Sequence, residues 1–342
     1  MNELMQVKNL KMHFPFSKSK GIFKKATGVL KAVDDVSFTL YSGETFGIVG
    51  ESGCGKTTLG RSLIRIYKPT GGEVLWHEKD GSVADLAKLP EKQMRKYWQD
   101  IRMVFQDPKG SLNPRLTVKD IISEAMKENK LGTEAEITER VRYLMSRVGL
   151  RPEYLYRYPH AFSGGERQRI GIAAALSVNP RLVIADEPVS ALDVSVQAQT
   201  INLMEDLQQD FNLTYIFIAH NLSVVQHISD RVMVMYVGKM VELADTNTLY
   251  RRPMHPYTNA LLSAVPYPDP AKRNTEHIEL QGNVADPANP PSGCYFHPRC
   301  PYATEQCRTQ VPVPAEIESG HFVSCHRAEE LDLPGKATFK WS

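Results

Sequence analysis

The sequence predicts an α/β fold that is built around a phosphate-binding loop. Residues 50–58, GESGCGKTT, lie between an apolar run at 45–49 and a segment at 59–64 whose apolar spacing suits a helix. A second apolar run at 182–187 ends in two carboxylates. A strand, a glycine-rich turn and a helix form the context that a P-loop requires. Carboxylates at the end of a further strand suit the magnesium ion that accompanies a phosphate bound by such a loop.

The loop itself has the composition that a polyphosphate site needs. Glycines let the backbone wrap the anion, so that successive N–H groups and the positive end of the following helix face it. We expect Lys56 to reach the outer phosphates and Thr57 to ligate a magnesium ion. The predicted nucleotide contacts are Gly50, Glu51, Ser52, Gly53, Cys54, Gly55, Lys56, Thr57 and Thr58.

Composition and charge exclude several classes of protein. The chain of 342 residues has 41 Lys and Arg against 39 Asp and Glu, and this near-neutral balance argues against a nucleic-acid binder. No stretch reaches the roughly 20 apolar residues that cross a bilayer, and residues 1–6 do not resemble a signal peptide. We therefore expect a cytosolic chain that reaches a membrane only through a partner.

Two strands are predicted before the loop. Residues 4–14 alternate loosely between apolar and polar, which favours an early edge strand, and residues 29–40 favour a second strand. Phe14 or Phe16 could stack on a purine base, and burial of either ring in the core is the alternative. The basic segment at 18–25 is expected to be a solvated loop rather than a membrane contact.

The middle of the chain predicts a helical insertion. A strand at 101–105 ends at Gln106, and residues 107–162 then carry helical spacing that is punctuated by Pro, Gly and Asn. Ser163 and Glu166 form a capping box for the next helix. The two residues between them, Gly164 and Gly165, leave the first amides of that helix uncovered, as a second anion site requires.

Later strands end in polar side chains. The apolar strand at 181–187 is typical of a Walker B strand, in which Asp186 holds magnesium and Glu187 polarises the attacking water. A strand at 214–219 ends at His220, which could contact a terminal phosphate, although a lone histidine is more often structural. Residues 230–242 predict a hairpin that turns at Gly238.

Five pieces in one order resemble the ATP-binding subunit of ABC transporters over residues 4–265. They are GESGCGKTT at 50–58, Gln106, SGGERQ at 163–168, LVIADE at 182–187 with SALD at 190–193, and His220. The stretches at 105–115, 157–166, 186–199 and 255–266 look like the oligopeptide and dipeptide permease branch. The resemblance implies a P-loop NTPase with a RecA-like core, an antiparallel β subdomain, a helical subdomain at about 107–165, and a small cysteine-containing domain at 266–342.

The same resemblance implies hydrolysis of ATP with Mg²⁺. Gln106, Glu187 and His220 would be catalytic, and Thr57, Gln106 and Asp186 would surround the magnesium ion. The resemblance also implies that two such cassettes face each other head to tail, so that Ser163, Gly164, Gly165, Glu166 and Asp193 would complete the ATP site of the partner. Glu166 stands where the family signature more often has Gln.

The implied role is to power an importer of di- or oligopeptides. The partners would be a paralogous ATPase subunit, two transmembrane permease subunits and an extracytoplasmic binding protein, at the cytoplasmic face of the inner membrane. Three alternatives stay open: an importer of nickel or oligosaccharides, a soluble ABC ATPase that works on ribosomes or DNA, and a catalytically silent partner. A single cassette without long coiled coils argues against the second, and the presence of Glu187 and His220 against the third.

Four cysteines follow the proline-rich stretch that begins at Pro266. A reducing cytosol disfavours disulfides, so four thiols this close together indicate a metal centre. Their spacing lacks the close Cys-two-Cys pairs of common zinc sites, and the resemblance implies a [4Fe–4S] cluster, with zinc or unliganded thiols as the alternatives. The candidate ligands are Cys294, Cys300, Cys307 and Cys325.

Overall fold

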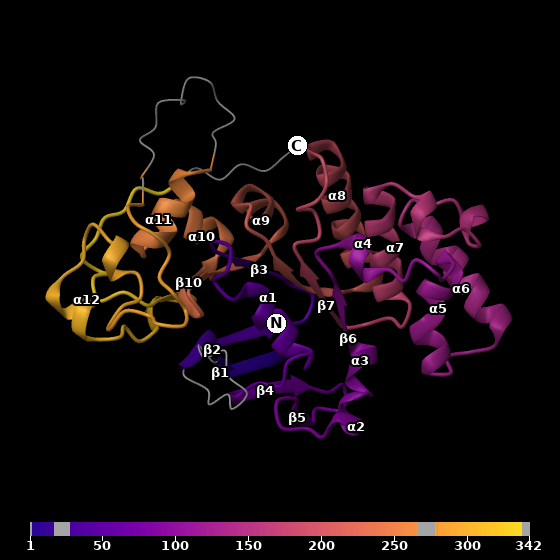
Figure 1. The fold of residues 1–342 in the computed structure, drawn as a ribbon, viewed down its shortest axis with the longest axis horizontal. Helices are drawn as coiled ribbons and strands as arrows, with labels where there is room; N and C mark the ends of the chain where they lie inside the picture. The colour runs from indigo at the N-terminus through magenta and orange to yellow at the C-terminus, as the bar shows by residue number, and fades with distance from the viewer. Residues whose placement is uncertain (1, 17–27, 266–277, 279, 337–342) are drawn as a thin grey trace, which may run out of the picture. The chain divides into compact units, whose positions relative to one another are not determined.

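The computed structural model describes residues 2–16, 28–265, 278 and 280–336 (Figure 1). This described chain forms two compact units: unit 1 holds residues 41–45 and 89–218, and unit 2 holds the remainder. The basic segment at 18–25 and the first prolines of the tail, Pro266, Pro268 and Pro270, lie outside the described residues. Within the described ranges, no helix combines the length and the apolar character that a bilayer span needs.

Unit 2 begins with an antiparallel sheet of four strands, drawn in indigo to purple in Figure 1. Its order is β2–β1–β4–β5, with β1 at Glu3–Phe16, β2 at Gly28–Tyr41, β4 at Gly71–His77 and β5 at Val83–Asp85. Both strands predicted before the loop are confirmed, but the prediction of an edge position for the first is wrong, because β1 has β2 on one side and β4 on the other. Alternation of apolar and polar residues indicates that one face of a strand is buried, but it does not show how many strands pair with that strand.

A second set of strands in unit 2 leads to the phosphate loop. Strands β11, β12, β10, β9 and β3 follow one another in this order. They span β3 Thr45–Val49, β9 Arg231–Tyr236, β10 Lys239–Asp245, β11 Ala315–Glu318 and β12 His321–Val323. Strand β3 pairs parallel with β9, and β9 and β10 form the predicted hairpin around Gly238. All five residues of β3 are buried, which explains its continuous apolar run.

The described helices of unit 2 are short. They are α1 Lys56–Leu63, α9 Leu222–Ile228, α10 Thr246–Arg251, α11 Pro256–Ser263 and α12 Glu305–Thr309, with a 3₁₀ turn at His297–Arg299. Helix α1 begins directly after the glycine-rich loop, as the sequence predicted.

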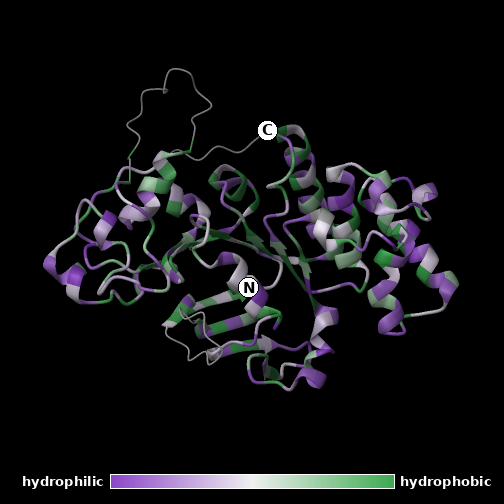
Figure 2. Cartoon of the chain, in the orientation of Figure 1, coloured by the Kyte–Doolittle hydropathy of each residue, from purple (hydrophilic) through white to green (hydrophobic). Residues whose placement is uncertain are grey.

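Unit 1 contains three parallel strands, β6 Ile101–Val104, β7 Leu182–Asp186 and β8 Thr214–Ile218. Strand β7 lies between the other two, and every residue of β7 and β8 is buried. In Figure 2 these strands are largely hydrophobic, whereas the surrounding helices carry both hydrophobic and hydrophilic residues. The three strands predicted at 101–105, 181–187 and 214–219 are therefore confirmed.

The described backbone of 107–162 contains helices and no strand, as predicted. These helices are α4 Pro108–Ser111, α5 Val118–Glu128 and α6 Glu134–Arg147, followed by 3₁₀ turns at Pro152–Tyr154 and Pro159–Ala161. The other helices of unit 1 are α2 Glu91–Met94, α3 Tyr97–Asp100, α7 Gly164–Leu176 and α8 Val194–Phe211. Capping boxes begin both α6 and α7, which is why these two starts can be read from the sequence.

The C-terminal residues join the sheet of unit 2 through short strands. Leu243 of β10 pairs with Phe322 of β12, and β11 pairs with β12. The fully buried Glu242 accepts hydrogen bonds from the backbone N–H groups of Met254 and His255, at 2.7 and 3.0 Å, and its Oε1 lies 2.8 Å from His321 Nε2. A buried carboxylate needs such partners, so Glu242 fixes three segments to one another.

Candidate nucleotide site

The phosphate loop is shaped by glycines that the fold requires. Gly50 and Gly55 have φ values of +151° and +104°, in the region that favours glycine. A Cβ atom on Gly50 would lie 2.2 Å from the carbonyl oxygen of Met235, and one on Gly55 would lie 2.0 Å from that of Ala32. The loop is thus pressed against strands β9 and β2, which fixes its curvature.

Lys56 points into this curve. Its Nζ donates hydrogen bonds to the carbonyl oxygens of Gly50, at 2.7 Å, and Glu51, at 3.1 Å, and it lies 3.9 Å from Cys54 Sγ. The side chain is 5% exposed. A buried ammonium group inside a ring of backbone groups is placed to bind an anion that the loop surrounds. Burial raises the pKa of the Cys54 thiol, which keeps it neutral there.

The start of α1 adds further donors. Gly55 is its N-cap residue and has no side chain to cap the helix, and the first turn has no acidic residue. The first amides of α1 therefore remain available to an anion. Ser52 and Gly53 are exposed, so the loop is open to solvent. These features fit a polyphosphate.

His220 lies at the same end of β3 as the loop. The N–H group of Ala219 donates to the carbonyl oxygen of Ile48, 3.1 Å away, two residues before the loop begins. His220 follows directly and is exposed. The structure thus brings His220 close to the end of the strand from which the loop departs.

In unit 1, two predicted catalytic side chains contact each other. Gln106 Nε2 donates to Glu187 Oε2 at 2.9 Å. Glu187 has a φ of +47°, which is uncommon for a residue other than glycine, and its N–H group donates to the carbonyl oxygen of Ile218. The preceding residue, Asp186, is fully buried at the end of β7. The amide of Gln106 orients the carboxylate of Glu187, which can accept a proton from a bound water.

The start of α7 has the predicted capping box. Ser163 Oγ accepts from the Glu166 N–H at 3.3 Å, and Glu166 Oε2 accepts from the Ser163 N–H at 2.8 Å. Hydrogen bonds to the Glu166 carboxylate from the backbone N–H and the side chain of Ser163 lower the pKa of Glu166. A Cβ on Gly165 would lie 2.7 Å from Val196, whereas one on Gly164 would meet no atom within 4 Å among the described residues. Glycine is therefore required sterically at 165 and leaves the backbone uncovered at 164.

Asp193 caps the neighbouring helix α8. Its carboxylate accepts from the Val196 N–H at 3.0 Å and from the Ser195 hydroxyl at 2.8 Å. The hydrogen bond from Val196, followed by that from Ser195, lowers the pKa of Asp193. Asp193 is thus held by its own helix, and its role toward a nucleotide stays a prediction.

The aromatic base-stacking residue remains open between two rings of β1. Phe14 packs edge-on against Tyr67, with ring centroids 5.4 Å apart. Phe16 covers Gly28, where a Cβ would lie 2.5 Å from its ring. Both rings are half-buried. The predicted magnesium ligands, Thr57, Gln106 and Asp186, draw on both units, and this set also stays a prediction.

Sequence reasoning missed two side chains that contact the loop. The N–H group of Glu51 donates to the Tyr257 hydroxyl at 2.9 Å. Arg299 donates to both carboxylate oxygens of Glu51, at 2.7 and 3.1 Å. These partners come more than 200 residues after the loop, and no local pattern marks them.

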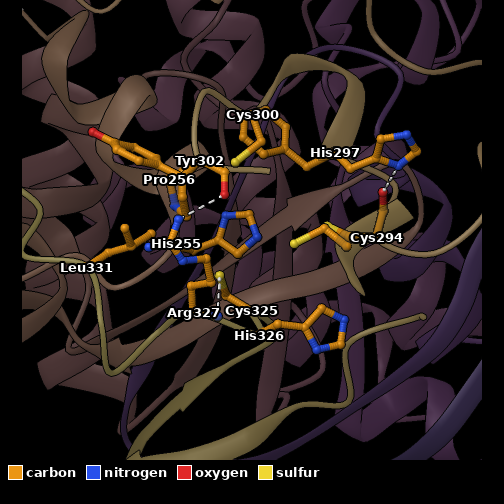
Figure 3. A pocket seen from close by; sticks show the side chains of 12 residues that line it. His255, Pro256, Cys294, His297, Cys300, Tyr302, Cys325, His326, Arg327 and Leu331 are labelled. Carbon is orange, nitrogen blue, oxygen red and sulfur yellow. Dashed lines mark hydrogen bonds between the residues drawn. The ribbon is translucent and has the colours of Figure 1, made fainter. Parts of the chain in front are cut away.

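The four cysteines of the tail line one cavity, together with His255, His297 and His326 (Figure 3). Burial raises the pKa of the Cys294 thiol, and it raises the pKa of Cys300 to about 11 and that of Cys325 to about 12. Over the described residues, no three His, Cys, Asp or Glu side chains are grouped as a metal ion would need. The thiol donor set suits a metal–sulfur centre, but the metal centre stays a prediction.

Comparison with known proteins agrees with this geometry. Residues 33–190 match the ABC transporter family, and residues 241–307 match the oligopeptide/dipeptide transporter C-terminal region. The oligopeptide transport ATP-binding protein AppF of Bacillus subtilis is 54% identical over 94% of this chain and 97% of its own length. The putative oligopeptide transport ATP-binding protein YkfD of the same organism is 51% identical over 94% of this chain and 95% of its own.

Solved structures show the same fold. The ATP-binding cassette MJ0796, in a dimeric post-hydrolysis state bound to ADP and Pi, has a TM-score of 0.61 at 23% identity, covering 71% of this chain and 99% of that one. CbiO1 of Clostridium perfringens has a TM-score of 0.60 at 25% identity, covering 73% and 91%. The fold is that of a P-loop NTPase, as predicted. The chain belongs to the oligopeptide/dipeptide branch of the ABC transporter ATP-binding proteins and is an ABC-type ATPase.

Proposed function

We propose that this chain hydrolyses ATP to power an importer of di- or oligopeptides. The observation that carries the proposal is the phosphate loop after β3, in which the buried Lys56 ammonium group donates hydrogen bonds to the carbonyl oxygens of Gly50 and Glu51. The peptide cargo is supported by the relatives, which are named as oligopeptide transport ATP-binding proteins and match nearly the whole chain.

Each group of the candidate site has a role in phosphoryl transfer. Loop amides and Lys56 bind the β- and γ-phosphates, and Thr57, Gln106 and Asp186 would hold a magnesium ion, whose charge would stabilise the transferred group. Glu187 accepts the proton of the attacking water, and Gln106 keeps its carboxylate in place through their 2.9 Å hydrogen bond. His220 contacts the γ-phosphate.

The proposal includes a partner subunit. The uncovered backbone at Gly164, at the N-terminus of the 13-residue helix α7, supplies amides for the γ-phosphate of an ATP bound to a paralogous subunit, which returns the same contact. Asp193 lies at the neighbouring helix start. Closure of this head-to-tail pair around ATP drives two permease subunits at the cytoplasmic face of the membrane, and an extracytoplasmic binding protein delivers the cargo.

The cargo is tested with the complete transporter in liposomes. We expect the binding protein loaded with a di- or oligopeptide to stimulate ATP hydrolysis, because cargo delivery promotes closure of the ATPase pair. The same assay is run with nickel and with an oligosaccharide, and with a Lys56→Met complex as the background control. Stimulation by nickel or by the oligosaccharide, with none by peptides, would exclude the peptide cargo.

The cysteine cavity is proposed to hold a [4Fe–4S] cluster with a structural or regulatory role and no part in hydrolysis. Support comes from the four thiols that line one cavity. Protein purified without oxygen is expected to be brown and to contain iron and acid-labile sulfide. Cys300→Ser should lose the colour, while Cys54→Ser, a change in the phosphate loop, should keep it. Colourless protein with stoichiometric zinc would reject the cluster.

A further inference from the structure

Glu51 places a negative charge on a loop that binds polyphosphate. The carbonyl oxygen of Glu51 lies 3.1 Å from Lys56 Nζ, the cation that faces the anion. Charges that are closer than a Debye length, about 8 Å at physiological ionic strength, repel one another with little screening. An uncompensated carboxylate on this loop would therefore weaken the binding of a triphosphate.

Arg299 compensates the charge of the Glu51 carboxylate through a bidentate salt bridge. Its Nη1 and Nη2 atoms donate to the two carboxylate oxygens of Glu51, at 2.7 and 3.1 Å. The Arg299 side chain is 6% exposed and that of Glu51 is 27% exposed, so water screens the pair only in part. The hydrogen bond to Glu51 raises the pKa of Arg299, which keeps the guanidinium charged. Such a fork fixes orientation as well as charge.

The Glu51 backbone is held from the same side by a buried aromatic cluster. Tyr257 accepts the Glu51 N–H, and its ring packs against Tyr236 and Phe296 with centroids 4.8 and 5.3 Å away. The Arg299 guanidinium carbon lies 5.9 Å from the centre of the Tyr236 ring. The two contacts to Glu51 therefore rest on one packed group rather than on a loose surface side chain.

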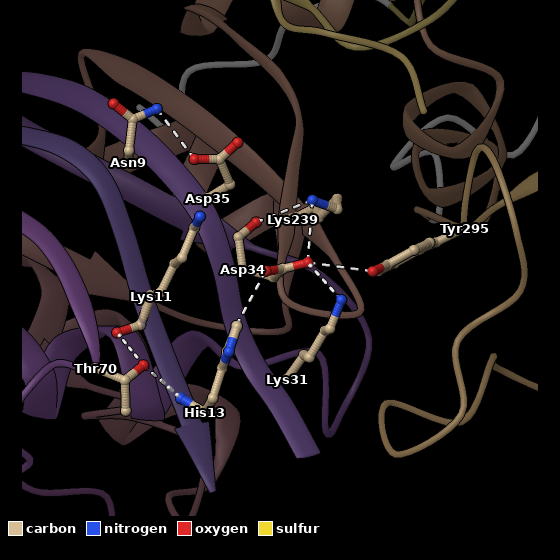
Figure 4. A network of polar contacts seen from close by, with 9 residues as sticks. All are labelled: Asn9, Lys11, His13, Lys31, Asp34, Asp35, Thr70, Lys239 and Tyr295. Atoms are coloured by element: carbon tan, nitrogen blue, oxygen red, sulfur yellow. Dashed lines mark hydrogen bonds and ion pairs between the residues drawn. The ribbon is translucent and has the colours of Figure 1, made fainter. Parts of the chain in front are cut away.

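The segment that carries Arg299 is anchored a few residues earlier. Tyr295 donates from its hydroxyl to Asp34 of β2, at 3.1 Å (Figure 4). Asp34 also contacts Lys239 and Lys31, at 3.2 and 3.7 Å. Burial by itself raises the pKa of Asp34, but the attraction of Lys239, with Lys31 and the hydrogen bonds, outweighs burial and lowers it. Asp34 thus stays charged and ties this segment to the strand beside the loop.

We propose that Arg299 is a positioning residue for nucleotide binding. It neutralises the Glu51 carboxylate and fixes the entry of the phosphate loop, so that the C-terminal residues set the affinity of the loop for ATP. This inference rests on the proposed function, because it requires ATP to bind at residues 50–58. It adds a contribution from outside the ATP-binding motifs.

The test is a double-mutant cycle on Arg299 and Glu51. Arg299→Met is expected to raise the KM for ATP about tenfold, equivalent to about 1.4 kcal/mol, and to leave kcat within about twofold. Glu51→Gln alone should lower the KM, because it removes the carboxylate and leaves the Arg299 charge beside the loop, and the double variant should return the KM close to that of the native chain. Arg252→Met, which breaks the exposed pair with Glu318, is the matched control and should change neither constant.

Rescue separates charge compensation from simple support of the fold. A merely structural Arg299 predicts that the double variant is at least as impaired as Arg299→Met. Arg299→Lys retains the charge without the fork, and its KM should fall between those of the native chain and Arg299→Met. Two results would overturn this inference and leave the proposed function standing, provided that the native chain binds ATP. One is an Arg299→Met variant with the native KM for ATP. The other is a double variant in which Glu51→Gln does not restore the KM that Arg299→Met has raised. A native chain that does not bind ATP would overturn the proposed function and this inference together.

Discussion

Replacing Glu187 with Gln is expected to reduce ATP turnover by about 10²- to 10⁴-fold, the usual contribution of a positioned general base. The Gln side chain has a similar shape but cannot accept the proton of the attacking water. ATP binding should persist, because the loop and Lys56 are unchanged, and the variant should accumulate in its ATP-bound form. Phosphate release and bound nucleotide are measured on the same preparation.

The control for this change is Glu139→Gln, an exposed glutamate on α6. It removes the same charge from unit 1 and should leave turnover as it is. Undiminished hydrolysis by Glu187→Gln would remove Glu187 from the role of base. Gln106→Ala should reduce ATP turnover less than Glu187→Gln does. It removes the 2.9 Å hydrogen bond that orients the Glu187 carboxylate but leaves the carboxylate itself in place.

Replacing Lys56 with Met should abolish ATP binding at ordinary concentrations. The ammonium group makes two hydrogen bonds inside the loop, and hydrogen bonds to charged groups contribute about 1.5–3 kcal/mol each. Transfer of such contacts to phosphate oxygens implies a loss of affinity of about a hundredfold or more when Lys56 is removed. Titration of the purified chain with MgATP measures the effect directly.

Lys68→Met is the matched control, since Lys68 is exposed shortly after α1. It should bind ATP as the native chain does. Because Lys56 is buried, thermal unfolding of both variants must be compared as well. A folded Lys56→Met chain that binds ATP with native affinity would contradict the assignment of residues 50–58 as the triphosphate site.

The parts of the fold that could be predicted are those with a local physical signature. The continuous apolar runs of β3, β7 and β8 correspond to strands that are buried along their whole length. The helix start at Ser163 was predictable because both halves of its capping box lie within four residues. The glycine spacing of the loop was predictable because its backbone needs those conformations.

Other parts depend on contacts that the sequence does not display. The loose alternation of β1 predicted a strand but not its two neighbours, β2 and β4. Strands β11 and β12 have only four and three residues, too few for a recognisable period. Their attachment to β10 is accompanied by the buried pair of Glu242 and His321, which are far apart in the chain.

The candidate site divides in the same way. Lys56, Gln106 and Glu187 were identified from motifs, and the contact between the latter two is local to the ends of β6 and β7. Tyr257 and Arg299 were not identified, because their function toward the loop arises only from their positions in the folded chain. In the folded chain both residues contact Glu51: Tyr257 accepts a hydrogen bond from its backbone N–H, and Arg299 donates to its carboxylate.

We propose that the binding site for a triphosphate on residues 50–58 of this chain is completed by the uncovered backbone at Gly164, at the start of helix α7 of a partner subunit. Light scattering of Glu187→Gln chain mixed with its paralogous subunit, with and without MgATP, tests it most directly. We predict that MgATP converts separate chains into a pair. Gly164→Arg places a large side chain over the uncovered backbone at the start of α7 and should weaken this pairing. Separate chains at saturating MgATP, with nucleotide bound to each, would contradict the claim.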